Sequence, residues 1–120
     1  GEAEPFSMIA TRDIGEVAAA ALLAPPSATE WIELQGPRDY SYADAAAIAS
    51  EVLARKVTAV PVPVEQVVPI MTSIGFSPKA AALYREMIEG RLRGTVAFEG
   101  KGRRANGKVS LADVLRRGLA

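Results

Sequence analysis

The segment Ile32-Glu-Leu-Gln-Gly-Pro-Arg-Asp-Tyr-Ser41 decides how the chain folds, because it contains a strand, a break and a helix start within ten residues. Apolar and polar side chains alternate at the beginning of this segment, which predicts a β-strand over Trp31–Gln35. The Gly-Pro pair that follows ends the strand. Ser41 and Asp44 then have the spacing of a capping box, which predicts a helix that continues to about Arg55.

The residues before this segment predict a helix behind an extended N-terminal stretch. The run Ile14–Leu23 is rich in alanine and leucine, which favour helix. Asp13 precedes the run, and we expect its carboxylate to cap the helix by accepting hydrogen bonds from free amides of the first turn. Capping is a simpler role for Asp13 than catalysis. Pro25 and Pro26 end the helix because proline cannot continue it.

The residues after the segment predict a second strand and a broken helix. Val57–Val62 has high β-propensity, and Pro61 within it indicates an edge strand or a strand end. Glu65–Ile74 is helical in pattern but contains Pro69, where we expect a kink or a break. Gly75 is suited to the residue that follows a helix C-terminus.

A further helix is predicted from a serine N-cap followed by a proline. Ser77 and Pro78 give the cap and the first helical residue, and the helix runs to about Arg93, where Gly94 stops it. Its apolar stripe contains Ala82, Leu83, Tyr84, Met87 and Ile88.

The C-terminal part predicts little regular structure before a last helix. Thr95–Phe98 is interpreted as a brief extended piece and Glu99–Gly107 as a glycine-rich loop. Ser110 and Asp113 form another capping-box pattern, which predicts a helix over Leu111–Arg117.

Together these elements predict one small α/β domain over residues 1–120, mostly helical, with about two short strands and four to five helices. Two strands do not form a comfortable sheet alone, so they resemble additions to a sheet whose other strands are missing. The unpaired edges of the Trp31–Gln35 strand invite pairing with a second copy. We therefore predict a homodimer that forms through exposed strand edges.

The composition excludes several classes of function. Hydrophobic residues make up 49% of the chain, and 14 basic residues balance 14 acidic ones, so no general field attracts nucleic acid or a membrane. Cysteine and histidine are absent, which excludes disulfides, thiolate nucleophiles, Cys/His zinc sites and histidine-based triads. With no membrane-spanning run and no signal peptide in view, we expect a cytoplasmic protein.

The start of the chain suggests that it was cut from a longer protein. It begins with Gly1, and its first methionine is Met8, inside an apolar stretch. We expect an excised domain or a proteolytic remnant. A natural short protein that starts near Met8 is the alternative.

No complete catalytic or nucleotide-binding motif occurs. The segment Gly100–Gly107 is glycine-rich, but it is not a Walker motif, since Val109 follows Lys108, and no GxGxxG is present. Its basic residues are interpreted as a solvated loop rather than a phosphate site; they are Lys101, Arg103, Arg104 and Lys108. No tyrosine has a lysine four residues later. Glu86 and Glu89 are interpreted as part of a solvated charged face.

The order of these segments resembles the NmrA-like proteins, atypical members of the short-chain dehydrogenase/reductase superfamily. Ile9–Ala18 resembles their (I/V)-x-x-x-D-I-G-x-(V/A)-A segment, and Ile32–Ser41 is similar to their strand, Gly-Pro and serine-capped helix. Residues 55–66 are similar to G-R-x-V-x-x-V-P-V-P-x-E-x, although the family often has glycine where Ala54 stands. Ile74–Pro78 matches G-(L/F)-(S/P) before a helix. The resemblance covers about residues 5–118.

The resemblance implies the C-terminal, substrate-side lobe of a Rossmann-type fold, without the nucleotide-binding half. The family contacts NADP or NAD chiefly through that missing half, so we expect no cofactor binding and no activity from this chain alone. Some members reduce small quinones or carbonyl compounds with NADPH, and others are NAD(P)-sensing regulators. Whether the parent protein is an enzyme therefore stays open.

The resemblance also implies a small lobe that faces the substrate cleft. The residues that we expect on the substrate side are Ile70, Met71, Phe76, Tyr84 and Met87. The competing interpretation is that Phe76 and Met87 belong to the core of the lobe. Tyr84 combines a ring that packs with a hydroxyl that can reach a polar group. A different class of function, a stand-alone interaction module that dimerises, is the alternative.

Overall fold

The computed structural model describes residues 4–25 and 27–119, which form an α/β structure that is about half helical. Five α-helices, one 3-10 helix and four short strands occur in these residues. The α/β class expected from the sequence is thus confirmed. The chain divides into two compact units: unit 1 contains Gly1–Ala59 and Gly100–Ala120, and unit 2 contains Val60–Glu99. The sequence-based predictions about Gly1, as the start of the chain, and Pro26, as part of a helix stop, fall on residues outside the described ones.

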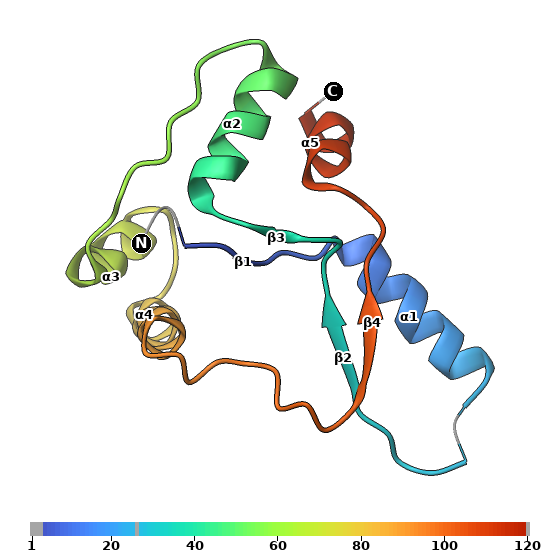
Figure 1. The fold of residues 1–120 in the computed structure, drawn as a ribbon. Coiled ribbons are helices and arrows are strands. Elements are labelled where there is room, and N and C mark those ends of the chain that lie inside the picture. Colours follow the sequence, from blue (N-terminus) through green and yellow to red (C-terminus); the bar gives the residue numbers. More distant parts are fainter. Residues whose placement is uncertain (1–3, 26, 120) are drawn as a thin grey trace. The chain divides into compact units, whose positions relative to one another are not determined.

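Unit 1 has two small pairs of strands (Figure 1). Strand β1 (Phe6–Ser7) pairs antiparallel with β3 (Asp39–Tyr40). Strand β2 (Ile32–Gln35) pairs with β4 (Arg103–Asn106), and these two strands are parallel. The predicted strand at Trp31–Gln35 is therefore present, shorter by one residue.

Strand β4 corrects the prediction that Glu99–Gly107 is a loop throughout. Its glycine-rich, basic composition does not predict a strand. The backbone hydrogen bonds that form the strand are made with β2, which is far away in the sequence. The amide of Arg103 donates to the Trp31 carbonyl at 3.0 Å, and the amide of Gly107 donates to the Gln35 carbonyl at 2.7 Å. Pairing between distant segments has overridden the local preference of the chain.

The second predicted strand, Val57–Val62, is absent. The amide of Val57 donates instead to the Ser50 hydroxyl at 2.9 Å, which ties this segment to the end of a helix. Pro61 and Pro63 lack the N–H that a sheet ladder needs. The predicted extended piece at Thr95–Phe98 is also not a strand, because Thr95 folds back onto the preceding helix.

The helices of unit 1 are α1 (Thr11–Leu23), α2 (Tyr42–Leu53) and α5 (Leu111–Leu119). The capping box at the start of α2 is confirmed: the Ser41 hydroxyl accepts from the Asp44 amide, and the Asp44 carboxylate accepts from the Ser41 amide. Helix α2 packs against α5. Helix α1 starts earlier than predicted, so Asp13 lies in its first turn and is not its N-cap.

Unit 2 is a short helical hairpin. A 3-10 helix, η1 (Val64–Gln66), leads into α3 (Val67–Ser73), which packs against α4 (Pro78–Leu92). The predicted kink or break at Pro69 is absent: the 3-10 helix gives way to α-helix at Val67, and α3 continues through Pro69 to Ser73. Pro69 is tolerated because the amides of the first helical turn have no partner within the helix.

Both helices of unit 2 end at a glycine in the left-handed region. Gly75 has φ +103° and Gly94 has φ +72°. At the end of α3, the amides of Gly75 and Phe76 donate to the carbonyls of Thr72 and Met71. At the end of α4, those of Gly94 and Thr95 donate to the carbonyls of Arg91 and Gly90. These are two Schellman motifs, as the glycines predicted.

Few side chains of the described residues are deeply buried. The buried apolar ones are Tyr40 in unit 1 and Val67 and Ala81 in unit 2. The buried polar ones, Asp13 and Ser41, are both in unit 1. Polar contacts around these two side chains therefore carry much of the organisation of unit 1.

Candidate functional site

The five residues predicted on the substrate side all belong to unit 2. They lie on α3, in the turn that follows it, and on α4: Ile70 and Met71, then Phe76, then Tyr84 and Met87. Met71 is half-buried and the other four are exposed. They are thus available on the surface of the hairpin, and the interpretation that Phe76 and Met87 are buried core does not fit this exposure.

The structure brings part of this set together. The rings of Phe76 and Tyr84 lie 6.5 Å apart between centroids, tilted by 58°, a favourable aromatic geometry. Met87 is three residues from Tyr84, so these two side chains share a face of α4. Ile70 and Met71 are consecutive on α3 and therefore point about 100° apart. The aromatic pair is the centre of the candidate surface.

The side chains of this surface are those of a binding surface for a mostly apolar molecule. Four of its side chains are apolar, and the Tyr84 hydroxyl is the one polar side-chain group among the five. Such a surface can contact an apolar or aromatic molecule and offer it one hydrogen bond.

Ion pairs lie beside this surface on α4. Glu89 contacts Arg85 at 3.4 Å and Arg93 at 3.7 Å between nitrogen and oxygen. All three side chains are partly exposed to solvent, so each pair contributes little to stability. This arrangement agrees with the charged, solvated face expected around Glu86 and Glu89.

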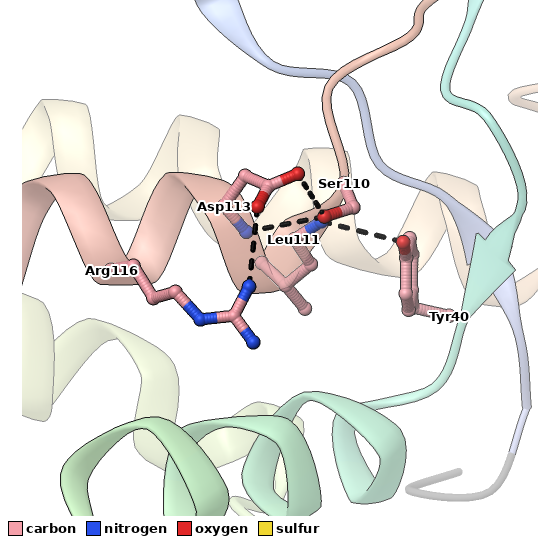
Figure 2. A network of polar contacts seen from close by, with 5 residues as sticks. All are labelled: Tyr40, Ser110, Leu111, Asp113 and Arg116. Atoms are coloured by element: carbon pink, nitrogen blue, oxygen red, sulfur yellow. Dashed lines mark hydrogen bonds and ion pairs between the residues drawn. The ribbon is translucent and has the colours of Figure 1, made fainter.

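A network of hydrogen bonds in unit 1 stabilises the start of α5 (Figure 2). The Ser110 hydroxyl donates to the Asp113 carboxylate at 2.7 Å and accepts from the Asp113 amide at 3.2 Å. The hydrogen bond from Ser110 lowers the pKa of the Asp113 carboxyl, and the positive charge of Arg116 lowers it further. The amide of Leu111 donates to the Tyr40 hydroxyl at 3.4 Å.

Tyr40 links this network to the strands. Its side chain is 3% exposed, and the Arg38 guanidinium lies 4.3 Å from the centre of its ring. A cation over an aromatic face is stabilising. Tyr40 thus has a structural role at the centre of unit 1, which its position in the sequence did not indicate.

Asp13 has a different role from the one predicted. Its carboxylate is buried and accepts from the amides of Lys108 and Val109 at 3.1 and 3.0 Å. A Cβ atom at Gly107 would lie 2.6 Å from the same carboxylate oxygen, so glycine is needed there. Asp13 therefore connects the first turn of α1 to the segment between β4 and α5.

The basic stretch around β4 has acidic partners on or beside β2. Arg103 contacts Glu30 at 3.4 Å, and Arg104 contacts Glu33 at 3.6 Å. Glu33 also accepts from the amide of Gly100 at 2.7 Å. These contacts draw positive charge toward β2, which weakens the case for a phosphate site in this stretch.

In residues 4–25 and 27–119, no three His, Cys, Asp or Glu side chains are grouped so that they could hold a metal ion. Across the same residues, no helix has both the length and the apolar character required to cross a bilayer.

No protein family model, curated protein or solved structure matches this chain. The NmrA-like resemblance therefore stays a prediction from the residues that carry it.

Proposed function

We propose that this chain is the substrate-side part of an NmrA-like NAD(P)-binding protein, the C-terminal lobe of a Rossmann-type fold. The observation that carries the proposal is the parallel pairing of β2 with β4. Sheets made only of parallel strands occur almost only in α/β proteins, where helices cover both faces of the sheet. An isolated parallel pair is therefore the expected remainder of a sheet whose other strands belong to a nucleotide-binding half.

In this proposal the parent protein binds NADP or NAD through its other half. It either reduces a small quinone or carbonyl compound or senses the cofactor as a regulator. The surface around Phe76 and Tyr84 contacts the small-molecule substrate, because an aromatic pair with one hydroxyl suits a flat, mostly apolar compound with a carbonyl oxygen. This chain alone is inactive, and we place it in the cytoplasm.

The test is a titration of the isotope-labelled chain with a small naphthoquinone, followed by NMR. We expect chemical-shift changes at Phe76, Tyr84 and Met87, weakened several-fold by Tyr84→Phe. The matched control is Tyr42→Phe, since Tyr42 is an exposed tyrosine of unit 1. Absence of shifts in unit 2, or shifts confined to unit 1, would contradict the assignment of the surface.

A parallel titration with NADPH, followed by calorimetry, tests the assignment of the cofactor site to the missing half. We expect no binding up to millimolar cofactor. Micromolar binding would mean that the chain builds a nucleotide site itself, and Gly100–Gly107 would be the first segment to mutate.

The second candidate is a stand-alone interaction module that forms a homodimer. The outer edges of the two-stranded β2–β4 pair favour it, because unpaired strand edges can pair with another chain. This candidate predicts a defined oligomer in solution.

A further inference from the structure

The chain contains a single asparagine, Asn106, and a glycine follows it. Asparagine is one of the chemically labile residues of proteins. The backbone nitrogen of the next residue can attack its side-chain carbonyl carbon, and glycine hinders this attack least because it has no Cβ atom. Asn106 is the last residue of β4, and Gly107 lies directly after the strand. The pair is therefore a candidate site of spontaneous deamidation.

The reaction of such a pair requires only water. The Gly107 nitrogen gives up its proton and forms a bond to the Asn106 Cγ atom, while the bond from Cγ to the side-chain nitrogen breaks. The side-chain nitrogen and the proton leave as ammonia, and a cyclic succinimide remains. Water then adds to either ring carbonyl and opens the ring to an aspartyl or an isoaspartyl linkage. No electron is transferred, so the reaction needs no oxidant, reductant or cofactor.

The structure opposes ring closure through Gln35, which lies opposite Asn106 in the parallel pair of β2 and β4. The Gln35 side-chain nitrogen donates to Oδ1 of Asn106 at 2.7 Å. The Gly107 amide, which would be the attacking group, donates to the Gln35 carbonyl, also at 2.7 Å. Both hydrogen bonds must break before the Asn106 side chain can turn back over the following amide. The reactive form is therefore a chain in which the end of β4 has separated from β2.

Asp13 restrains the same segment just beyond the pair. Its Oδ2 atom accepts hydrogen bonds from the amides of Lys108 and Val109 at 3.1 and 3.0 Å. These two residues directly follow Gly107, so the end of β4 cannot move far while both hydrogen bonds are intact. Gln35 and Asp13 together therefore set the population of the reactive form.

We propose that Asn106–Gly107 is a deamidation site that the pairing of β4 with β2 keeps unreactive, and that deamidation prevents the end of β4 from pairing again. The isoaspartyl product lengthens the main chain by one carbon atom, which moves the Gly107 amide out of register with the Gln35 carbonyl. The lengthened chain has no room toward α1, because even a Cβ atom at Gly107 would lie 2.6 Å from the Asp13 carboxylate. Deamidation thus makes a transient separation of the strands permanent.

Both products of the reaction also change the charge of this region. Each replaces the neutral Asn106 side chain with a carboxylate, one residue before the glycine that packs against the buried Asp13 carboxylate. Like charges repel each other more strongly where water is excluded. The new charge therefore acts in the same direction as the lengthened main chain. The modification is independent of the activity proposed for the parent protein.

Gln35 and Gly36 provide a comparison within the same chain. Gln35 also has a side-chain carboxamide and precedes a glycine. Its side chain is longer by one methylene group, so ring closure would give a larger imide ring, which forms more slowly. The Gly36 amide also donates to the Ser7 hydroxyl at 3.0 Å. We expect Gln35 to stay unmodified under conditions that convert Asn106.

The first experiment incubates the full chain at mildly alkaline pH with and without concentrated guanidinium chloride, and peptide mapping by mass spectrometry follows the conversion of amide to acid. We expect conversion of Asn106 to be at least about tenfold faster in denaturant, because the reactive form then predominates. Gln35 should be unconverted in both samples. Equal rates at Asn106 in the two samples, or no conversion in denaturant, would overturn the proposal.

The second experiment changes the two restraining residues in the absence of denaturant. Asp13→Ala and Gln35→Ala should each speed conversion of Asn106 several-fold. Asp13→Asn should stay close to the parent rate, because a carboxamide oxygen can accept the same two hydrogen bonds. Glu16→Ala, which removes an exposed ion pair from α1, is the matched control and should have no effect.

Two results of the second experiment would contradict the proposal. Unchanged rates in both alanine variants would show that Gln35 and Asp13 do not restrain the reaction. Equal acceleration in Asp13→Asn and Asp13→Ala would show that the hydrogen bonds of Asp13 are not the restraint.

The third experiment measures amide hydrogen exchange in isotope-labelled chains after the incubation. The isoaspartyl chain, separated by chromatography, should lose protection at the amides of Arg103 and Gly107, which donate to β2 and its flanking residue in the parent structure. The variant Asn106→Gln resists the reaction and should keep the protection that it had before incubation. An isoaspartyl chain with the same protection as the parent would refute the effect proposed for the modification.

Discussion

Units 1 and 2 are held together in different ways. In unit 1 the important contacts join distant residues, such as Asp13 to Lys108 and Gln35 to Asn106. In unit 2 they join near neighbours, such as Ser77 to Ala80 at the start of α4 and Gly90 to Thr95 at its end. Unit 1 therefore depends on a few long-range polar contacts, whereas unit 2 depends on well-formed helix ends.

The largest expected effect is the loss of Asp13. Asp13→Ala leaves the amides of Lys108 and Val109 without their acceptor, and we expect a loss of about 2–4 kcal/mol in the stability of unit 1. Amide hydrogen exchange should show reduced protection in unit 1 and unchanged protection in α3 and α4.

The matched control is Glu16→Ala on the same helix, where an exposed pair with Arg12 is removed. We expect a change of less than about 1 kcal/mol for this variant. Equal effects of the two substitutions would contradict the role assigned to Asp13.

The next effect concerns the helix end in unit 2. Gly75→Ala places a Cβ atom at φ +103°, a conformation that favours glycine, and we expect a loss of about 1–2 kcal/mol in unit 2. Urea denaturation followed by far-ultraviolet circular dichroism, with amide exchange in α3, measures it.

The reverse substitution in unit 1 should have the opposite sign. Ala54 is a non-glycine residue with φ +50° at the end of α2, so Ala54→Gly should stabilise unit 1 by up to about 1 kcal/mol. A destabilising result there would show that the backbone geometry at this helix end is not the governing factor.

The smallest effect is a difference in acid sensitivity. The hydrogen bond from the Ser41 amide, and that from the Ser41 hydroxyl, lower the pKa of the Asp44 carboxyl. A pKa lowered by folding contributes stability above the unfolded pKa of about 4, and this contribution is lost as the pH falls through the folded pKa. We therefore expect α2 of unit 1 to weaken as the pH falls below about 4.

Helix α4 provides the comparison, because its cap, Ser77, has no carboxylate partner in the motif. Amide exchange in α2 and α4 as a function of pH measures the difference. Asp44→Asn should reduce the loss of amide protection that α2 shows at low pH. If α2 loses the same protection at low pH in this variant, the assignment to Asp44 is wrong.

The difference between local and long-range contacts also explains which features of the fold the sequence could predict. The helix boundaries at Ser41, Ser77, Gly75 and Gly94 follow from local chemistry, because the cap and the amide that it satisfies are at most a few residues apart. Strand β4 was missed because its ladder partner, β2, lies 71 residues away at Gln35 and Asn106.

In the candidate site, too, the sequence predicted local features but not the contacts between elements. The helical pattern placed Tyr84 and Met87 on one face of α4, and the exposure of both agrees with a surface role. The contact between the Phe76 and Tyr84 rings depends on the angle between α3 and α4, which no periodicity specifies. The burial of Asp13 likewise requires Gly107 to approach it from the far end of the chain.

The parallel pairing of β2 with β4 also affects how the protein is made. During synthesis β2 leaves the ribosome before all of unit 2, and its partner follows only afterwards. For that interval β2 has unpaired edges, as does any strand whose ladder is incomplete. Unit 2, built from local contacts, can fold early and shorten the effective loop that β4 has to close. Nascent chains that stall between residues 60 and 102 would therefore be the form most prone to aggregate.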